Sequence, residues 1–290
     1  MRVLVLGATG YIGSAVVARL TLEGHDVVPL VKDASDWDPD APLRVGDLTD
    51  PASLRAAVTD DVDAVVNLAT PTGDEAVDTA ALDALLAPLR GTGRAFVYTS
   101  GVWVLGATGD APVDEDAATD PIAIVGYRPR IEERVRTAAR ENVRAVVVRP
   151  GIVYGRGGGI PAMMTGWAKD HGTGRYVGSA ATRWPMVHVD DLAELYALVL
   201  AKAEAGAVLH GVAHEAVPVA AVAAVADLAA GGTGRAEPWP VEGAAEVLGA
   251  PFAEALALHQ VVSGQRAAEV LGWRPSRPYV LTELAGGTRG

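Results

Sequence analysis

Apolar residues in the first 150 positions of the chain gather in short runs that alternate with stretches of helical spacing. The runs predict strands at Val3–Leu6, Val27–Val31, Leu43–Val45, Ala64–Leu68, Ala95–Thr99 and Ala145–Arg149. The other stretches predict helices near Tyr11–Glu23, Pro51–Thr59, Glu75–Leu89, Pro129–Glu141 and Asp190–Ala203. Near-continuous apolar strands are typical of sheets that are buried on both faces, and strands that alternate with helices indicate βαβ units. We therefore predict an α/β fold with a doubly wound parallel sheet.

The first strand runs directly into a glycine-rich turn. Glycines stand at positions 7, 10 and 13, and the residues that follow suit a helix. In such a unit the first glycine allows the turn, the second lets the backbone approach phosphate groups, and the third allows close packing of the helix. The unpaired N–H groups and the dipole at the helix start favour negative charge. The pattern predicts a dinucleotide pyrophosphate site.

Composition narrows the class of partner. The chain has 290 residues and a net charge of −12, which does not suit a nucleic-acid or anionic-membrane surface. No uninterrupted apolar stretch reaches membrane-spanning length, and Gly7 and Gly10 interrupt the start, where a secretion signal needs an apolar region. We expect a cytoplasmic protein that acts on a small molecule, as a monomer or homodimer, with no nucleic-acid or membrane partner.

Two residue counts add to this. The chain has no cysteine, which excludes disulfides, thiolate catalysis and cysteine-based metal sites, and we predict no metal. It has three lysines against 21 arginines and is rich in Ala, Val and Gly. We interpret this bias as the mark of a bacterial, GC-rich coding sequence.

The GxxGxxG spacing and several later motifs resemble the extended branch of the short-chain dehydrogenase/reductase family. The later motifs are Asp47-Leu48, Asn67-Leu68-Ala69-Thr70, Tyr98-Thr99-Ser100-Gly101, Arg149-Pro150-Gly151-Ile152-Val153-Tyr154-Gly155, Val187-His188-Val189-Asp190-Asp191-Leu192 and Leu271-Gly272-Trp273-Arg274-Pro275. The resemblance covers nearly the whole chain. It implies a Rossmann core over residues 1–150, on which residues 187–203 pack back, and a smaller substrate-binding lobe over residues 151–290.

The resemblance also implies which residues bind the cofactor. They are Gly7, Thr9, Gly10, Tyr11, Ile12, Gly13, Lys32, Asp47, Leu48, Leu68, Ala69, Thr70, Arg128 and Pro150. At the end of the second strand a carboxylate would favour NAD, and a cation would favour the 2′-phosphate of NADP. Lys32 follows the usual acidic position and Asp33 is one residue later. We predict NADP(H), with NAD(H) as the alternative if Asp33 turns inward.

The usual proton relay of the family has no counterpart here. The family's Tyr and Lys stand four residues apart, one helical turn, and the Tyr exchanges the proton. The only tyrosine in this region is Tyr127, and Ile131 stands four residues later. Alignment with the family's helix pattern places Ile124 at the Tyr position and Arg128 at the Lys position. Arg128 remains suited to the ribose, but as a fixed cation it cannot shuttle a proton.

The fifth-strand motif departs from the family in a related way. Gly101 falls at the family's serine position, and the hydroxyl residues Ser100 and Thr99 lie just before it. The candidate catalytic residues are therefore Tyr127, Ser100 and Thr99. For Tyr127 the alternative is a tyrosine packed on the pocket wall.

Aromatic residues and methionines bracket the predicted lobe opening. The candidate substrate-pocket residues are Trp103, Tyr154, Met163, Trp167 and Trp184. Together they predict an apolar pocket, although such residues also serve as core. Trp184 stands where sugar-nucleotide enzymes of this branch place an Arg, which argues against a nucleotide-sugar substrate. We expect His188 to be structural and Asp190 to be a helix cap.

Three functions fit these observations. The first is an NADP(H)-dependent oxidoreductase that reduces a carbonyl or imine of a small, apolar metabolite. The second is a non-redox isomerase, lyase or cyclase that keeps the cofactor as a scaffold. The third is a cofactor-binding protein without turnover. The fold alone does not decide among them.

Overall fold

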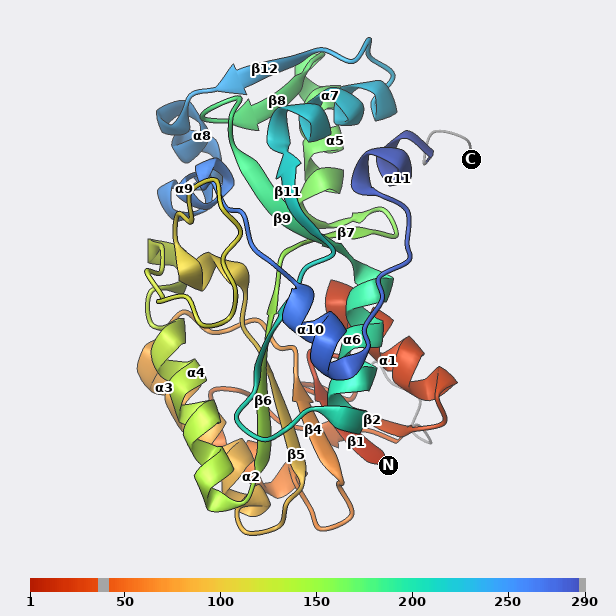
Figure 1. Cartoon of the computed structure of the whole chain (residues 1–290). Coiled ribbons are helices and arrows are strands. Elements are labelled where there is room, and N and C mark those ends of the chain that lie inside the picture. The colour runs from red at the N-terminus through yellow and green to blue at the C-terminus, as the bar shows by residue number, and fades with distance from the viewer. Residues whose placement is uncertain (36–41, 287–290) are drawn as a thin grey trace. The chain divides into compact units, whose positions relative to one another are not determined.

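The computed structural model describes residues 1–35 and 42–286 and is built around a seven-stranded sheet (Figure 1). The strand order is β10-β6-β5-β4-β1-β2-β3, and the pairings from β3 to β6 are all parallel. The strands are β1 (Arg2–Leu6), β2 (Asp26–Val31), β3 (Arg44–Val45), β4 (Ala64–Asn67), β5 (Ala95–Thr99), β6 (Arg144–Pro150) and β10 (Val208–Gly211). The predicted doubly wound sheet is confirmed; the sequence reasoning missed its edge strand β10.

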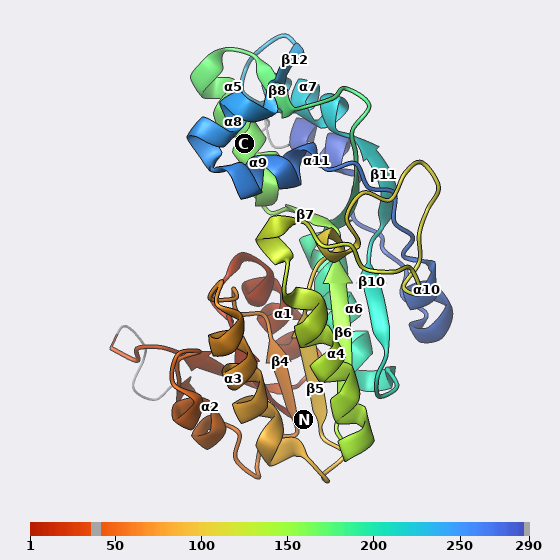
Figure 2. The same cartoon turned by 90° about the vertical axis from the view of Figure 1, so that its left-hand side faces the viewer.

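Helices cover both faces of this sheet. They are α1 (Tyr11–Leu22), α2 (Pro51–Ala57), α3 (Glu75–Leu86), α4 (Arg128–Ala138) and α6 (Val189–Lys202), with 3₁₀ turns η1 (Ala87–Leu89) and η4 (Ala139–Glu141). Figure 2 shows α2, α3 and α4 side by side on one face, with α1 behind the sheet. Leu54, Leu85 and Ile131 from these three helices pack on Leu4 and Phe96 of the strands. This is why the strands are apolar on both faces.

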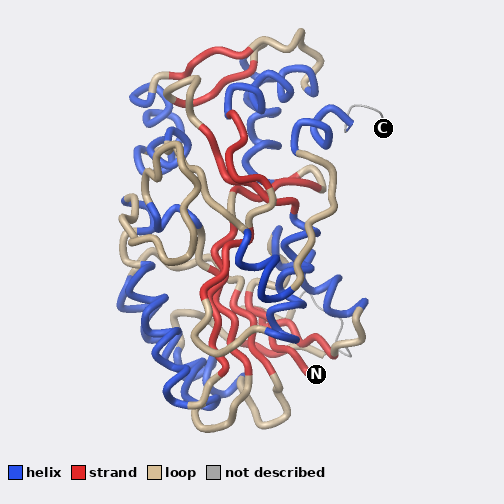
Figure 3. Tube along the Cα trace, viewed as in Figure 1, coloured by secondary structure: helices blue, strands red, loops and turns tan. Residues whose placement is uncertain are grey.

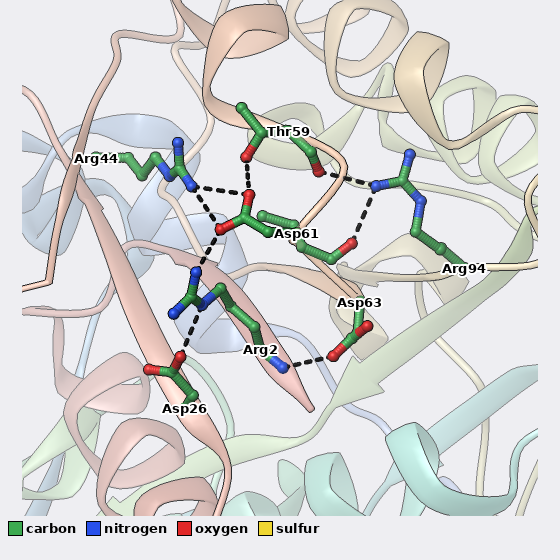
Figure 4. Close-up of polar contacts among 8 residues, drawn as sticks. Arg2, Asp26, Arg44, Thr59, Asp61, Asp63 and Arg94 are labelled. Atoms are coloured by element: carbon green, nitrogen blue, oxygen red, sulfur yellow. Dashed lines mark hydrogen bonds and ion pairs between the residues drawn. The ribbon is translucent and has the colours of Figure 1, made fainter.

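Ion pairs and hydrogen bonds link residues at the N-terminal ends of the strands (Figure 4). Arg2, at the start of β1, donates from its guanidinium to Asp26 and Asp61, and from its backbone N–H to Asp63 at 2.7 Å. Arg44 reaches the same Asp61 at 3.1 Å. The Thr59 hydroxyl and the Arg2 guanidinium lower the pKa of the Asp61 carboxyl to about 2. The opposite, carboxyl-terminal edge is where sheets of this kind bind ligands.

The remaining elements form two smaller sheets with their own helices (Figure 3). One sheet contains β11 (His214–Pro218), β9 (Arg183–His188) and β7 (Ile152–Gly155), and the other contains β12 (Ala236–Trp239) and β8 (Gly174–Val177). The helices are α5 (Gly159–His171), α7 (Val219–Ala229), α8 (Val241–Leu248), α9 (Ala250–Ala257), α10 (Gln265–Leu271) and α11 (Val280–Gly286), and the 3₁₀ turns are η2 (Val102–Leu105) and η3 (Ala123–Val125).

The chain divides into two compact units, each assembled from several stretches. The first contains Met1–Ser100, Tyr127–Val148 and Ala193–Leu209, and the second contains Gly101–Gly126, Arg149–Leu192 and the described residues from His210 onward. The segment between Gly101 and Gly126 thus belongs with the C-terminal elements, although the sequence reasoning assigned it to the core. The substrate-binding role of the second unit stays a prediction. Among the described residues, no helix has both the length and the apolarity that a membrane crossing requires.

Candidate cofactor and active site

The glycine turn links β1 to α1 in the way its spacing predicts. Gly7 has a positive φ of 72°, and its carbonyl accepts a hydrogen bond from the Gly10 N–H at 3.0 Å. A Cβ on Gly13 would lie 1.9 Å from the Gly7 oxygen. Only glycine permits this backbone at position 7 and this close packing at position 13.

The start of α1 is open to an anion. Gly10 is the N-cap, no side chain caps the helix, and the first turn holds no acidic residue. Gly10 has an extended backbone, and a Cβ there would meet only the Gly7 oxygen, at 3.2 Å. Thr9 is exposed, while Tyr11 and Ile12 are half-buried. The start of α1, where no side-chain cap hydrogen bond is made, and the bare Gly10 form a cradle that fits a pyrophosphate.

The loop after β4 lies against the glycine turn. A Cβ on Gly7 would come within 2.6 Å of the Leu68 carbonyl, so the two backbones touch. The Leu68 N–H donates to the Leu6 oxygen at 3.0 Å, and the Ala69 N–H donates to the Asn67 Oδ1 at 3.1 Å. The structure therefore brings the start of the predicted segment 68–70 beside the predicted turn. Asn67, which belongs to the quoted motif but was not among the predicted cofactor-binding residues, holds it there.

Lys32 and Asp47, both predicted to bind the cofactor, form an ion pair. The Lys32 Nζ lies 3.3 Å from Asp47, and the lysine side chain is 73% exposed. Hydrogen bonds from Thr49 lower the pKa of the Asp47 carboxyl, with a smaller contribution from Lys32. Asp33 instead accepts from the backbone N–H of Ser35 at 2.8 Å in its own loop. Lys32 is thus beside Asp47, another predicted cofactor-binding residue, whereas the Asp33 carboxylate is bonded within its own loop.

The hydroxyl groups of Thr99 and Ser100 differ in their partners. Thr99 Oγ1 lies 2.6 Å from the hydroxyl of Tyr196, a buried residue of α6. Ser100 follows the last residue of β5 and is 6% exposed, and its Oγ has no hydrogen-bond partner among the described residues. Buried hydroxyls are normally satisfied. Ser100 is therefore the candidate whose hydroxyl is not already bonded to another described group at the carboxyl end of the strand.

Tyr127 is the N-cap of α4, and its hydroxyl donates to the carboxylate of Asp78 on α3. Burial and Asp78 raise the pKa of Tyr127 to about 12. Arg128 is the first, half-buried residue of α4, and Ile124, at the family's Tyr position, lies in η3. Pro150 is buried at the end of β6. The Tyr127 hydroxyl proton is therefore directed at Asp78. The sequence reasoning missed Asp78 because three other acidic residues, Asp74, Glu75 and Asp83, stand near it in the sequence.

The predicted substrate residues all lie in the second unit, in different settings. Trp103 in η2 packs edge-on against Phe252, and Trp167 against Trp239. Trp184 is 2% exposed, and its indole N–H has no partner among the described residues. Met163 of α5 is exposed.

Tyr154 is buried, but it lines a cavity of about 410 Å³ together with residues of α5 and α11. Its hydroxyl donates to the Pro278 oxygen at 2.8 Å. Four of the five predicted substrate residues belong to or pack on one apolar core of this unit: Trp103, Tyr154, Trp167 and Trp184. Their contact with a substrate stays a prediction.

Two motifs of the sequence meet in the structure. The Asp191 carboxylate accepts hydrogen bonds from the backbone N–H groups of Ser276 and Arg277 at 3.0 and 3.1 Å. The Trp273 indole N–H donates to the backbone carbonyl oxygen of Asp191. The expectation that Asp190 caps α6 is wrong, because the helix begins at Val189 and Asp190 pairs with Arg156 at 2.6 Å. The two motifs therefore have a structural role in joining the C-terminal segment to α6.

Comparisons with known proteins agree with this geometry. Residues 3–210 match the NAD dependent epimerase/dehydratase family. A Schizosaccharomyces pombe protein known as "Uncharacterized protein C2A9.02" is 32% identical over 98% of both chains. The 3-diazoavenalumate denitrifying reductase of a Streptomyces species is 29% identical over 96% of this chain and 97% of its own. The structure of human epimerase family protein SDR39U1 with NADPH has a TM-score of 0.76 and 27% identity, and covers 99% of both chains.

Proposed function

Because the chain belongs to the NAD dependent epimerase/dehydratase family, within the extended short-chain dehydrogenase/reductase superfamily, we propose that it is an NADP(H)-dependent oxidoreductase. The proposed substrate is a small, apolar metabolite with a carbonyl or imine group. Membership of the superfamily confirms the resemblance inferred from the motifs. Members of the family are enzymes, among them epimerases, dehydratases and reductases.

The glycine cradle and Lys32 support the cofactor part of the proposal. The bare Gly10 and the uncapped start of α1 fit a pyrophosphate, and Lys32 offers a point charge to a 2′-phosphate. The NADPH seen with the human relative supports the same choice. When bound, the nicotinamide group supplies or accepts a hydride. The residues of the chain have to bind the cofactor, orient the substrate and provide for the transfer of a proton to the oxygen or nitrogen of the acceptor group.

The unpartnered hydroxyl of Ser100 is the observation that carries the reductase proposal. It is buried at the carboxyl end of β5, the edge where sheets of this kind bind ligands. A serine hydroxyl there can donate a hydrogen bond to the oxygen or nitrogen of the acceptor group as negative charge develops on it. Thr99 is already engaged with Tyr196, so we assign it a supporting role.

The test is the oxidation of NADPH against a panel of aldehydes, ketones and imines, followed at 340 nm with product identification by mass spectrometry. We expect consumption of NADPH in equal amount to the reduced product. Conversion of a substrate without net consumption of NADPH would contradict net reduction and favour the second candidate function, an isomerase, lyase or cyclase. Binding without conversion across the panel would favour the cofactor-binding protein.

The exposed ammonium of Lys32 leads to a prediction about cofactor preference. Lys32→Ala should weaken the binding of NADPH by about 1.5–3 kcal/mol, the range of a hydrogen bond to a charged group, and leave the binding of NADH nearly unchanged. Calorimetric titration of both cofactors measures the difference. Lys169→Ala, which removes an exposed lysine of the second unit, is the matched control. Equal losses for NADPH and NADH would contradict the phosphate contact.

The contact between Tyr127 and Asp78 leads to a prediction about the proton. We expect Tyr127→Phe to lower kcat less than about tenfold, because a general acid works best with a pKa near the operating pH, and the pKa of Tyr127 is about 12. The proton is then supplied by water. Steady-state kinetics with a substrate that the panel identifies will measure kcat. A loss of about 10²–10⁴-fold would instead identify Tyr127 as the general acid.

A further inference from the structure

The Asp78 carboxylate holds two segments of the chain at once. Its Oδ1 accepts from the Thr72 backbone N–H at 3.0 Å and from the Thr72 hydroxyl at 2.8 Å, and its Oδ2 accepts from the Tyr127 hydroxyl. All three residues lie in the first unit, and Asp78 is half-buried in the first turn of α3. A carboxylate with three donors from two segments, one adjacent to α3 and one 49 positions away, fixes both segments relative to α3.

The first of these segments is the loop after β4. One end of the loop, at Leu68 and Ala69, touches the Gly7 backbone of the glycine turn and is held by Asn67. Its other end is held at Thr72 by Asp78. The loop over residues 68–72 contains three residues predicted to bind the cofactor, Leu68, Ala69 and Thr70. It has no strand or helix of its own.

The second segment is the start of α4. Tyr127 is the N-cap of this helix and uses no side-chain cap of its own, and Arg128 follows as the first helical residue. The Tyr127 ring packs against the core cluster of the sheet, while its hydroxyl reaches Asp78 across 49 positions of sequence. The bond therefore fixes where α4 begins, and with it the backbone of Arg128.

We propose that Asp78 is a positioning residue that joins the loop over residues 68–72 to the start of α4 and thereby sets the affinity for the nicotinamide cofactor. The proposal rests on the proposed function, since both segments contain predicted cofactor residues. Two segments that are ordered before binding do not have to be ordered by the cofactor, so less binding free energy is lost. The competing view is that Asp78 only stabilises α3 through the helix dipole.

Glu75 provides a matched control for that competing view. It also stands in the first turn of α3, but its carboxylate pairs on the surface with Arg130 of α4, at 2.6 Å, and not with Thr72 or Tyr127. Glu75→Gln removes the same charge from the same helix end without touching the Thr72 loop. We expect Asp78→Ala to weaken NADPH about tenfold and Glu75→Gln to change its Kd less than twofold, with both variants folded by circular dichroism.

A spectroscopic titration tests the contact without any cofactor. Asp78 raises the pKa of Tyr127, so Asp78→Asn should move the ionisation of one tyrosine toward lower pH in the ultraviolet difference spectrum. The shift should be absent in a Tyr127→Phe background, and a merely structural role for Asp78 in α3 would not produce it. The Thr72→Val and Asp78→Ala variants should also affect the NADPH Kd non-additively.

These measurements separate two failures. If the wild-type protein binds neither NADPH nor NADH, the proposed function is wrong and the positioning role falls with it. If the wild type binds NADPH and Asp78→Ala binds it equally well, only the positioning role is overturned. Equal weakening by Glu75→Gln and Asp78→Ala would overturn the positioning role of the Thr72 and Tyr127 contacts, because Glu75 shares the helix end and also links α3 to α4 without making those contacts.

Discussion

Gly10→Val is expected to abolish the binding of NADPH while leaving the protein folded. The backbone of Gly10 is extended, with φ −70° and ψ 172°, so a β-branched residue can adopt it. The added Cβ would meet only the Gly7 oxygen, at 3.2 Å, a contact that a small local shift relieves. The rest of the side chain would occupy the space through which a phosphate approaches the N–H groups at the start of α1.

Thermal denaturation with and without the cofactor measures this loss. NADPH at 100 times its Kd stabilises the native state by about 2.7 kcal/mol, so the wild-type Tm should rise and that of Gly10→Val should not. Gly166→Val is the control, because a Cβ at this helical glycine of α5 meets no atom within 4 Å. A wild-type protein whose Tm responds to neither NADPH nor NADH would contradict the cofactor site itself.

Ser100→Ala is expected to lower kcat by about 10²–10³-fold, the loss seen when one donor to a developing negative charge is removed. The Kd for NADPH should stay within a factor of two, because the hydroxyl serves the acceptor group of the substrate. Folding should be unaffected, since the Ser100 Oγ has no partner to lose among the described residues. Removal of an unsatisfied buried hydroxyl can even raise the stability slightly.

The neighbouring Thr99→Val variant is the matched control for Ser100→Ala. It also removes one hydroxyl at the end of β5, but this hydroxyl is bonded to Tyr196. We expect a loss of stability of about 1–3 kcal/mol, because the buried Tyr196 hydroxyl is left unpaired, with a much smaller change in kcat. A Ser100→Ala variant with wild-type kcat would remove Ser100 from the mechanism and leave Tyr127 as the remaining hydroxyl candidate.

The sequence by itself determined the features that depend on neighbouring residues. Six strands of the central sheet and the helices between them follow from apolar periodicity, which records burial on one or both faces. The glycine turn was also predictable. The positive φ at Gly7 and the close approach of Gly13 to the Gly7 oxygen involve residues only six positions apart in the chain. The edge strand β10 was missed because only Val208 and Leu209 of its four residues are apolar, which is too short a run to indicate a strand.

Only the tertiary structure decided which polar side chains are engaged and which are available. The partners of Tyr127 and Thr99 are 49 and 97 positions away, and the topology of the sheet and its helices brings them together. Asp78 resembles the other acidic residues near the start of α3 until Thr72 and Tyr127 meet on it. Ser100 differs from Thr99 because its hydroxyl has no hydrogen-bond partner among the described residues. A hydrogen bond requires two groups within about 3 Å of each other, and residue type and spacing do not specify that distance for groups so far apart in the chain.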